Sequence, residues 1–121
     1  MSISPHVAQL RALVGTRLLQ LPSVAVLPAD PSGRILLVRH ADTGAWGILG
    51  GAIELDEAPE QAAIRETLEE VGVRPVITRL IGAFSGPEYR VEYPNGDQAS
   101  YVVITYEARL DVMKERLAAP A

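Results

Sequence analysis

The chain has 121 residues, 48% of them hydrophobic, and its 15 acidic residues outnumber its 11 basic ones, giving a formal net charge of −4. This length supports one hydrophobic core rather than two, and a negative balance argues against a passive nucleic-acid-binding protein, which needs a basic surface for the phosphates. Cysteine is absent and the only histidines are His6 and His40, which excludes disulfides, thiolate catalysis and metal sites rich in these residues. Any bound metal would be held mainly by oxygen ligands, which favours Mg²⁺ or Mn²⁺.

The sequence contains no apolar run long enough to span a bilayer. Its first ten residues, MSISPHVAQL, lack the basic-then-apolar order of a secretory signal. We therefore expect a soluble, cytoplasmic protein with no membrane partner.

The first half of the chain predicts a helix followed by strands. Helical spacing starts at Ser4-Pro5 and ends at Gly15, so residues 1–19 are predicted to hold an N-terminal helix and its lead-in. The runs SVAVLPAD and RILLVRH flank a turn of Asp30-Pro31-Ser32-Gly33 composition, which predicts a β-hairpin. The Gly-rich stretch that follows predicts a loop with a short strand near Ile48.

The second half predicts one more helix and three strands. Helical spacing returns from Pro59 to Val71, and Gly72 is well placed to end that helix. The runs VITRLIGAF, EYRVEY and QASYVVITYEARL are strand-like, and Asn95-Gly96 predicts a hairpin between the last two. Residues 111–121 are expected to form a short C-terminal tail.

Three glutamates crowd one face of the predicted helix: Glu66, Glu69 and Glu70. At 100° per residue, the apolar residues Ile64, Leu68 and Val71 fall on the opposite face. Like charges this close repel one another by a few tenths of a kcal/mol. Two explanations stay open: Arg65 pairs with Glu69 and the other acids are solvated, or a divalent cation lies between the carboxylates.

The stretch GGAIELDE places two adjacent glycines just before this helix, where a backbone without side chains lets a ligand approach closely. Residues 51–73 resemble the Nudix box, G-x5-E-x7-R-E-U-x-E-E-x-G-U, in which U is apolar. The matching residues are Gly51, Glu57, Arg65, Glu66, Glu69, Glu70, Gly72 and Val73. Eight fixed positions match by chance with a frequency on the order of 10⁻⁹ per alignment. Thr67 at the first apolar position and Leu49, where many members carry proline, are departures from the pattern.

The resemblance implies a Nudix-type α/β/α sandwich around a mixed β-sheet over residues 20–110. Nudix domains usually continue with a further strand and a C-terminal helix, which are missing or shortened after Leu110. Either the domain is incomplete, or a second copy in a homodimer covers the sheet, since an uncovered face or edge tends to find a partner.

The resemblance also implies Mg²⁺-dependent hydrolysis of a pyrophosphate bond in a nucleoside diphosphate linked to another moiety. The substrate stays open between nucleotide sugars such as ADP-ribose, dinucleoside polyphosphates and oxidised or otherwise damaged nucleoside triphosphates. By position in the box, the implied metal ligands are Glu66, Glu69 and Glu70, with the Gly51 carbonyl as a fourth. Alternatively, Glu66 or Glu69 orients or deprotonates the attacking water.

Other acidic and basic residues of the box have less direct roles. Arg65 is expected to hold a carboxylate, that of Glu57 or Glu69, rather than to contact substrate. Glu54 and Glu57 would either reach a second metal ion or stabilise the helix N-terminus. A non-catalytic nucleotide-binding or regulatory module is the alternative function, and the complete set of box glutamates favours the enzyme.

Outside the box, Arg39 is a candidate ligand of a substrate phosphate, or is simply solvated. Trp46 is expected to fill the core rather than to stack on a base. The segment FSGPEYR is the expected substrate-recognition loop, and it supplies Phe84, Glu88 and Tyr89 as binding residues. A catalytic base from outside the helix would be one of Glu88, Glu92 or Asp97. The two histidines are assigned no role.

Overall fold

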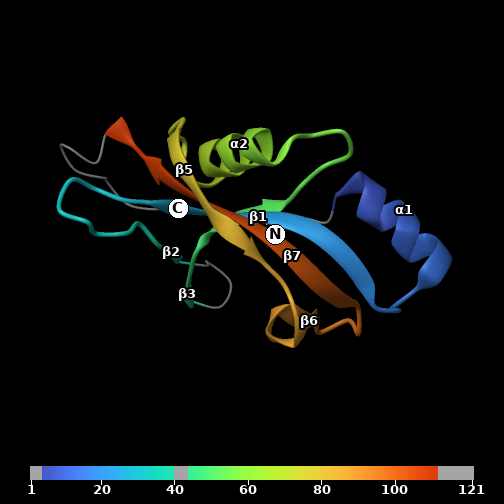
Figure 1. The fold of residues 1–121 in the computed structure, drawn as a ribbon. Coiled ribbons are helices and arrows are strands. Elements are labelled where there is room, and N and C mark those ends of the chain that lie inside the picture. The colour runs from blue at the N-terminus through green and yellow to red at the C-terminus, as the bar shows by residue number, and fades with distance from the viewer. Residues whose placement is uncertain (1–3, 40–43, 112–121) are drawn as a thin grey trace.

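The computed structural model describes residues 4–39 and 44–111. The described part has a mixed β-sheet and two α-helices, which confirms the predicted fold class (Figure 1). The elements are α1 (Pro5–Val14), β1 (Leu19–Pro28), β2 (Val38–Arg39), β3 (Trp46–Gly47), β4 (Leu49–Ala52), α2 (Pro59–Val71), β5 (Val76–Phe84), the short 3₁₀ helix η1 (Pro87–Tyr89), β6 (Arg90–Glu92) and β7 (Gln98–Arg109). His40 and most of the predicted C-terminal tail lie outside the described residues.

The main sheet has the strand order β4-β1-β7-β5, and β6 also pairs with β7. β1 and β7 run parallel, whereas β4 pairs with β1, and β5 and β6 pair with β7, in antiparallel fashion. The Asn-Gly hairpin between β6 and β7 forms as predicted. Its turn is closed by hydrogen bonds from the Tyr93 amide to Asp97 O (2.8 Å) and from the Gly96 amide to Tyr93 O (2.8 Å).

The N-terminal helix α1 also forms within the predicted limits. The Ser4 hydroxyl accepts a hydrogen bond from the Val7 amide (3.2 Å), and the helix ends at Gly15. α1 lies beyond the end of the sheet rather than on either face (Figure 1). Its link to the sheet is Arg11, which donates to Gln98 O at 2.6 Å.

The predicted hairpin between SVAVLPAD and RILLVRH is wrong in its second strand. The turn itself forms, because the Asp30 carboxylate accepts hydrogen bonds from the amides of Ser32 (2.9 Å) and Arg34 (2.8 Å). Beyond it only one isolated bridge, Ala29 to Ile35, joins the two runs. β1 already has β4 on one side and β7 on the other, so the second run cannot pair with it and instead forms β2, which pairs with β3.

Helix α2 packs on one face of the sheet, over β4 and β1 (Figure 1). Its buried residues are Ala62, Ala63, Glu66 and Thr67. Burial on α2 does not follow the division into apolar and acidic residues: the acidic Glu66 is only 8% exposed, whereas the apolar Leu68 is 46% exposed. Small side chains on α2 and in the Gly-Gly-Ala end of β4 let the helix sit close to the sheet, and Thr67 fits there by donating its hydroxyl to Ala63 O (2.8 Å).

The core lies between α2 and the sheet and includes Val24, Val26, Leu49 and Ala63. At the other side of the sheet β5 forms the edge of the described part, with Val76, Leu80 and Phe84 exposed. The expected homodimer stays a prediction. Neither helix in residues 4–39 and 44–111 is long and apolar enough to cross a membrane.

Candidate active site

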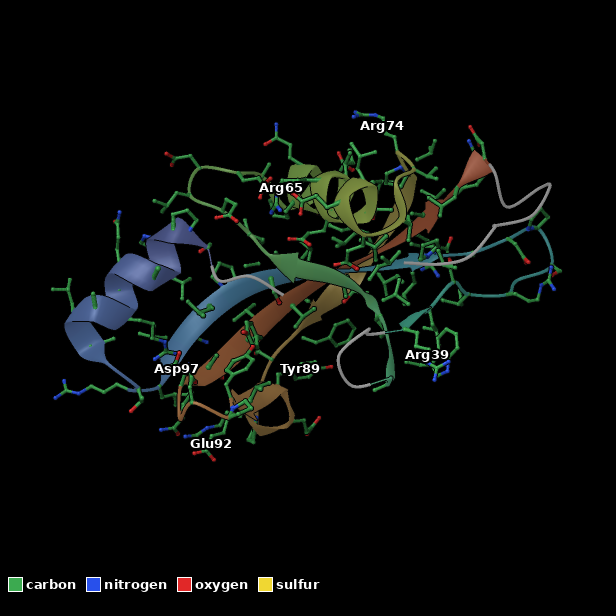
Figure 2. The ribbon with its side chains drawn as sticks, turned by 180° about the vertical axis from the view of Figure 1, so that it is seen from behind. Arg39, Arg65, Arg74, Tyr89, Glu92 and Asp97 are labelled. Atoms are coloured by element: carbon green, nitrogen blue, oxygen red, sulfur yellow. The ribbon has the colours of Figure 1, made fainter. Side chains whose placement is uncertain are left out.

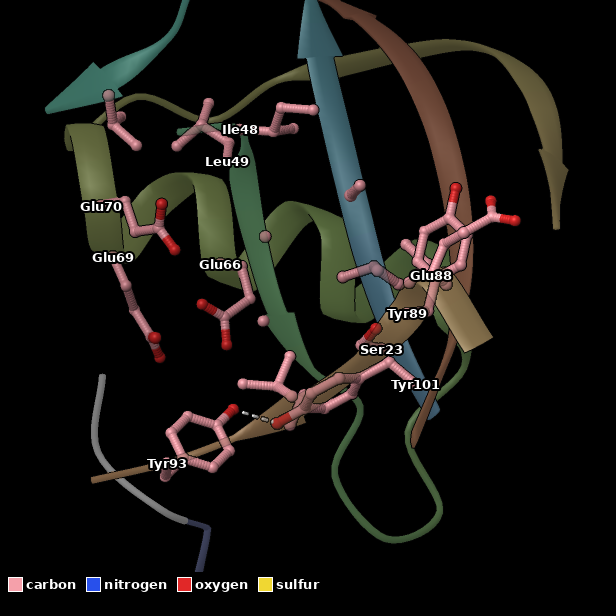
Figure 3. A pocket seen from close by; sticks show the side chains of 18 of the residues that line it. Ser23, Ile48, Leu49, Glu66, Glu69, Glu70, Glu88, Tyr89, Tyr93 and Tyr101 are labelled. Atoms are coloured by element: carbon pink, nitrogen blue, oxygen red, sulfur yellow. Dashed lines mark hydrogen bonds between the residues drawn. The ribbon is translucent and has the colours of Figure 1, made fainter. Parts of the chain in front are cut away.

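A cavity of about 730 Å³ extends across β4, from α2 on one side to the β6–β7 hairpin on the other (Figure 3). The first side is formed by Glu66, Glu69 and Glu70, which we call the acidic wall. The second is formed by Tyr89, Tyr93 and Tyr101, which we call the tyrosine wall. This volume is in the usual range for cavities that bind small molecules. The structure thus brings the three predicted glutamates to one cavity.

The glycines of β4 let the acidic wall approach the sheet. A Cβ atom on Gly51 would lie 2.4 Å from the carboxyl carbon of Glu66, and one on Gly50 would lie 2.1 Å from Val24 O. Real Cβ atoms do not come this close to other heavy atoms. Only glycine therefore allows β4 to lie between β1 and the Glu66 carboxylate, and Gly51 lies against the predicted metal ligand.

The carboxyl groups of Glu66 and Glu70 are hydrogen-bonded to each other. Burial raises the pKa of Glu66, and the charge of Glu69 raises it further, against the opposing effect of Arg65. Burial also raises the pKa of Glu70 to about 7, followed by the charge of Glu66 and a hydrogen bond between the two carboxyls. Two carboxylates this close cannot both ionise cheaply without a nearby positive charge. The pair therefore favours either a bound proton or a bound cation.

Arg65 connects three of the box acids, Glu57, Glu66 and Glu69. It donates from Nε and Nη2 to the two oxygens of Glu57, at 2.8 and 2.9 Å, in a bidentate pair. It also donates to Glu66 (2.9 Å) and to Ala52 O (2.9 Å), and lies 3.4 Å from Glu69. The hydrogen bond from Arg65 holds the pKa of Glu57 below its ordinary value. These contacts are those expected of a residue that positions carboxylates.

The donor set fits a hard divalent cation, because buried carboxyl oxygens that repel one another gain most from its charge. No group of three or more acidic, histidine or cysteine side chains has the spacing of an assembled metal site within the described ranges. The Glu69 side chain is 58% exposed and lies 3.4 Å from the same Arg65 nitrogen that donates to Glu66. Glu66 and Glu70 are therefore the preassembled part of the predicted ligand set.

The predicted residues outside the box divide into two groups. Arg39, Glu88 and Tyr89 line the cavity. Phe84 does not line it, and its ring packs beside Gly82. Asp97 lies 3.6 Å from Arg11, and Glu92 lies near it at the hairpin end, so neither faces the acidic wall (Figure 2).

Trp46 is not a core residue, contrary to expectation. It is 60% exposed, and the Arg39 guanidinium lies 6.0 Å from its ring centroid. Trp46 pairs with Arg39, which is also exposed, whereas Val38 of the same small β2–β3 sheet belongs to the core. Stacking on a ligand base thus stays open for this side chain.

Two cavity residues were missed by sequence reasoning, Tyr93 and Tyr101. Their hydroxyl groups are hydrogen-bonded to each other (Figure 3). A signal for them was present: the Asn-Gly turn sets the hairpin register, and alternation then places both tyrosines on one face of it.

Residues 19–118 match the family model described as NUDIX domain. Over 62 residues the chain is 44% identical to a MutT-like protein from Streptomyces ambofaciens, covering 51% of this chain and 40% of that protein. Over 67 residues it is 36% identical to a putative 8-oxo-dGTP diphosphatase from Bacillus subtilis (strain 168), covering 55% of this chain and 45% of that protein. An RNA pyrophosphohydrolase from Halorhodospira halophila is 39% identical over 62 residues, which is 51% of this chain and 34% of that protein. The chain spans less than half the length of the curated relatives it matches.

Solved structures agree with this result. A NUDIX hydrolase from Nitrosomonas europaea superimposes with a TM-score of 0.60 at 29% identity, covering 74% of this chain and 47% of that one. A MutT protein from Methanosarcina mazei Go1 superimposes with a TM-score of 0.56 at 20% identity, covering 84% of this chain and 75% of that one, which supports the fold alone. Since the family model covers most of the sequence and the box acids gather at one cavity, the chain belongs to the Nudix family.

Proposed function

We propose that this protein hydrolyses a pyrophosphate bond in a nucleoside diphosphate linked to another moiety, with Mg²⁺ or Mn²⁺ as cofactor. The observation that carries the proposal is the hydrogen-bonded carboxyl pair of buried Glu66 and half-buried Glu70, beside Gly51 in a cavity of about 730 Å³. Such a pair is costly to keep without a cation, and that cost is explained if the cation works on phosphate oxygens. The relatives named as diphosphatase and pyrophosphohydrolase support the same reaction class.

In this proposal Glu66 and Glu70 hold the cation, with Glu69 and the Gly51 carbonyl completing its ligands. A bound divalent cation neutralises phosphate charge and lowers the pKa of a bound water. To bind the cation with Glu66 and Glu70, the Glu69 carboxylate has to give up its 3.4 Å contact with Arg65. Its side chain is 58% exposed and therefore has room to turn. Glu66 or Glu69 takes up the proton of the attacking water.

Arg65 acts as a positioning residue. Its bidentate pair with Glu57 and its bond to Ala52 O fix the guanidinium between β4 and α2. The remaining nitrogen then holds the Glu66 carboxylate at 2.9 Å. Arg39, which also lines the cavity, would meet a substrate phosphate, and Glu88 and Tyr89 would contact the rest of the nucleotide.

The test is hydrolysis of a panel containing ADP-ribose, nucleotide sugars, dinucleoside polyphosphates, and nucleoside triphosphates with their oxidised forms. We expect Mg²⁺-dependent release of nucleoside monophosphate or phosphate. Glu69→Gln and Glu70→Gln should each remove most of the activity and leave the fold intact. Glu60→Gln is the matched control, because Glu60 is exposed on the same helix and does not line the cavity.

Wild-type turnover in both Glu69→Gln and Glu70→Gln would eliminate the assigned site. No turnover of any substrate by the folded, Mg²⁺-bound wild type would favour a nucleotide-binding module instead.

A further inference from the structure

Three of the four tyrosines in the chain belong to the tyrosine wall. The fourth, Tyr106, points to the other face of β7 and packs against the core beside α2. Within the described residues Arg39 is the only basic residue that lines the cavity. One wall is thus anionic and would carry a cation, whereas the other is aromatic, and the only charged side chain beside it among the described lining residues is the Glu88 carboxylate (Figure 3).

The backbone fixes both members of the Tyr93–Tyr101 pair. Tyr93 directly follows β6, and its amide and carbonyl close the hairpin turn with Asp97 and Gly96 at 2.8 Å each. Tyr101 lies within β7, opposite Leu21 of β1. Because neither backbone segment is a loose loop, the two hydroxyls are held at a defined place in the cavity (Figure 3).

Arg11 supports this arrangement from outside the cavity. Its side chain is only 11% exposed, donates to Gln98 O at 2.6 Å, and lies 3.6 Å from the Asp97 carboxylate. It therefore ties α1 to the start of β7, on the strand that carries Tyr101. Burial and the bond to Tyr93 raise the pKa of Tyr101, outweighing the opposing charge of Arg11, so Tyr101 keeps its hydroxyl hydrogen at neutral pH.

The two hydroxyl groups have a defined hydrogen-bonding capacity. Of their two hydroxyl hydrogens, one lies between the two oxygens and the other is left to bind a ligand, together with unused lone pairs. Aromatic rings stack on nucleobases whatever the base, because every base has a π-face. The tyrosines and the neighbouring Glu88 carboxylate give a phosphate no electrostatic attraction. Aromatic rings with free hydroxyl groups suit an uncharged base with a hydrogen-bonding edge.

We propose that the hydroxyl pair of Tyr93 and Tyr101 binds the nucleobase of the substrate and determines which base is accepted. This inference rests on the proposed function, because it places the phosphates at the acidic wall and the base at the tyrosine wall. The ring faces supply contact with any base, and the hydroxyl pair discriminates between base edges. The two residues are specificity determinants rather than members of the hydrolytic machinery.

The experiment measures binding without turnover. Calorimetry in Mg²⁺ would compare the α,β-methylene analogues of ADP, GDP, CDP and UDP, which differ only in the base, with methylenediphosphonate, which has no nucleoside. The variants are Tyr93→Phe and Tyr101→Phe, which remove one hydroxyl each and keep the ring. Tyr106→Phe is the matched control, since it removes a hydroxyl from the same strand on the opposite face. Thermal melts show that each variant is folded.

We expect the wild type to prefer one or two bases. Each cavity variant should bind the preferred analogue about three- to tenfold more weakly, because about one hydrogen bond is lost. The difference in affinity between the four analogues should therefore become smaller. The affinity of each cavity variant for methylenediphosphonate should equal that of the wild type. Tyr106→Phe should bind every analogue with wild-type affinity. Tyr93 is 36% exposed, so its variant keeps the test valid if Tyr101→Phe fails to fold.

The inference is overturned if both folded variants keep the wild-type base preference. It is also overturned if their affinity for methylenediphosphonate falls as much as their affinity for the nucleotide analogues. It is also overturned if the wild type binds no analogue or binds all four equally. Failure of the proposed function looks different. In that case the wild type binds a preferred analogue and loses that preference in the variants, yet hydrolyses no substrate of the panel.

Discussion

The Glu66 carboxylate lies where a side chain on Gly51 would have to be, since a Cβ atom there would come 2.4 Å from its carboxyl carbon. Glu66 is only 8% exposed, so it has little room to move away. The two residues are 15 positions apart in the sequence, and β4 and α2 bring them together. The glycine that starts the box is thus needed for the position of a glutamate in its helix.

Gly51→Ala tests this relationship. We expect the added methyl group to displace Glu66 from Glu70, and a displacement of about 1 Å can reduce catalysis by on the order of 10²-fold. The Mg²⁺ concentration needed for half-maximal activity should rise as well. Initial rates measured across a Mg²⁺ titration check both effects.

Gly82→Ala is the control for that substitution. Gly82 also lies in a strand and has no positive φ, and its added Cβ would meet only the edge of the Phe84 ring at 3.3 Å. The activity of Gly82→Ala should stay close to that of the wild type. Equal activity of Gly51→Ala and Gly82→Ala would show that the close approach of Gly51 to Glu66 has no part in the reaction.

A second prediction concerns the pair of Arg65 and Glu57, whose side chains are 28% and 15% exposed. Glu57→Gln removes the charge from a bidentate, partly buried pair, and should lower the free energy of unfolding by about 1–3 kcal/mol. Glu107→Gln is the comparison, because its partner Arg79 is 62% exposed and such surface pairs contribute about 0–1 kcal/mol. Urea denaturation measures both. A loss for Glu57→Gln no larger than that for Glu107→Gln would contradict the positioning role of Arg65.

Much of the fold followed from local sequence signals. Helix α2 ends where Gly72 adopts a left-handed conformation, with φ 75° and ψ 12°, and the Asn-Gly turn joins β6 to β7. The failures came from long-range competition, which local patterns do not encode. The run RILLVRH is strand-like, yet both edges of β1 are taken by β4 and β7. Likewise, periodicity marks Leu68 as apolar but does not reveal that α2 packs through its alanines.

The candidate site, too, could be predicted only in part from the sequence. The acidic wall could be predicted because all of its residues lie within one helix turn of each other. The tyrosine wall could not be assigned without the three-dimensional arrangement, because its relation to the acids depends on β7 lying beside β1 and β1 beside β4. The spacing of Tyr93 and Tyr101 indicates a shared face, but not that this face meets the cavity.

The position of Trp46 gives a third prediction. Because Trp46 is 60% exposed, Trp46→Ala should change the free energy of unfolding by less than about 1 kcal/mol. Leu49, three residues later, is fully buried at 0% exposure, and Leu49→Ala should cost about 2–5 kcal/mol. Chemical denaturation compares the two variants directly. A loss of several kcal/mol for Trp46→Ala would instead support the core-filling role expected from the sequence.

The last prediction concerns pH in the absence of metal. The pKa of Glu70 is about 7 in the folded protein, raised by burial and by Glu66 from an ordinary value of 4.5. Between these two values the folded protein keeps a proton that the unfolded chain has already released, so stability falls as the pH rises. Glu66, whose pKa is also raised by burial, acts in the same direction.

Melting temperatures measured with EDTA across pH 4.5–8 would show this effect as a decline for the wild type that is smaller in Glu70→Gln. Glu60→Gln should keep the full wild-type decline, because Glu60 lies outside the cavity. Mg²⁺ should reduce the decline, since a cation binds the ionised carboxylates of the folded state and stabilises it at higher pH. Parallel profiles for the wild type and Glu70→Gln in EDTA would mean that Glu70 ionises freely in the folded protein. In that case the positive charge of Arg65 alone would be enough to balance the carboxylates of the acidic wall. The Glu66–Glu70 pair would then no longer argue for a bound cation.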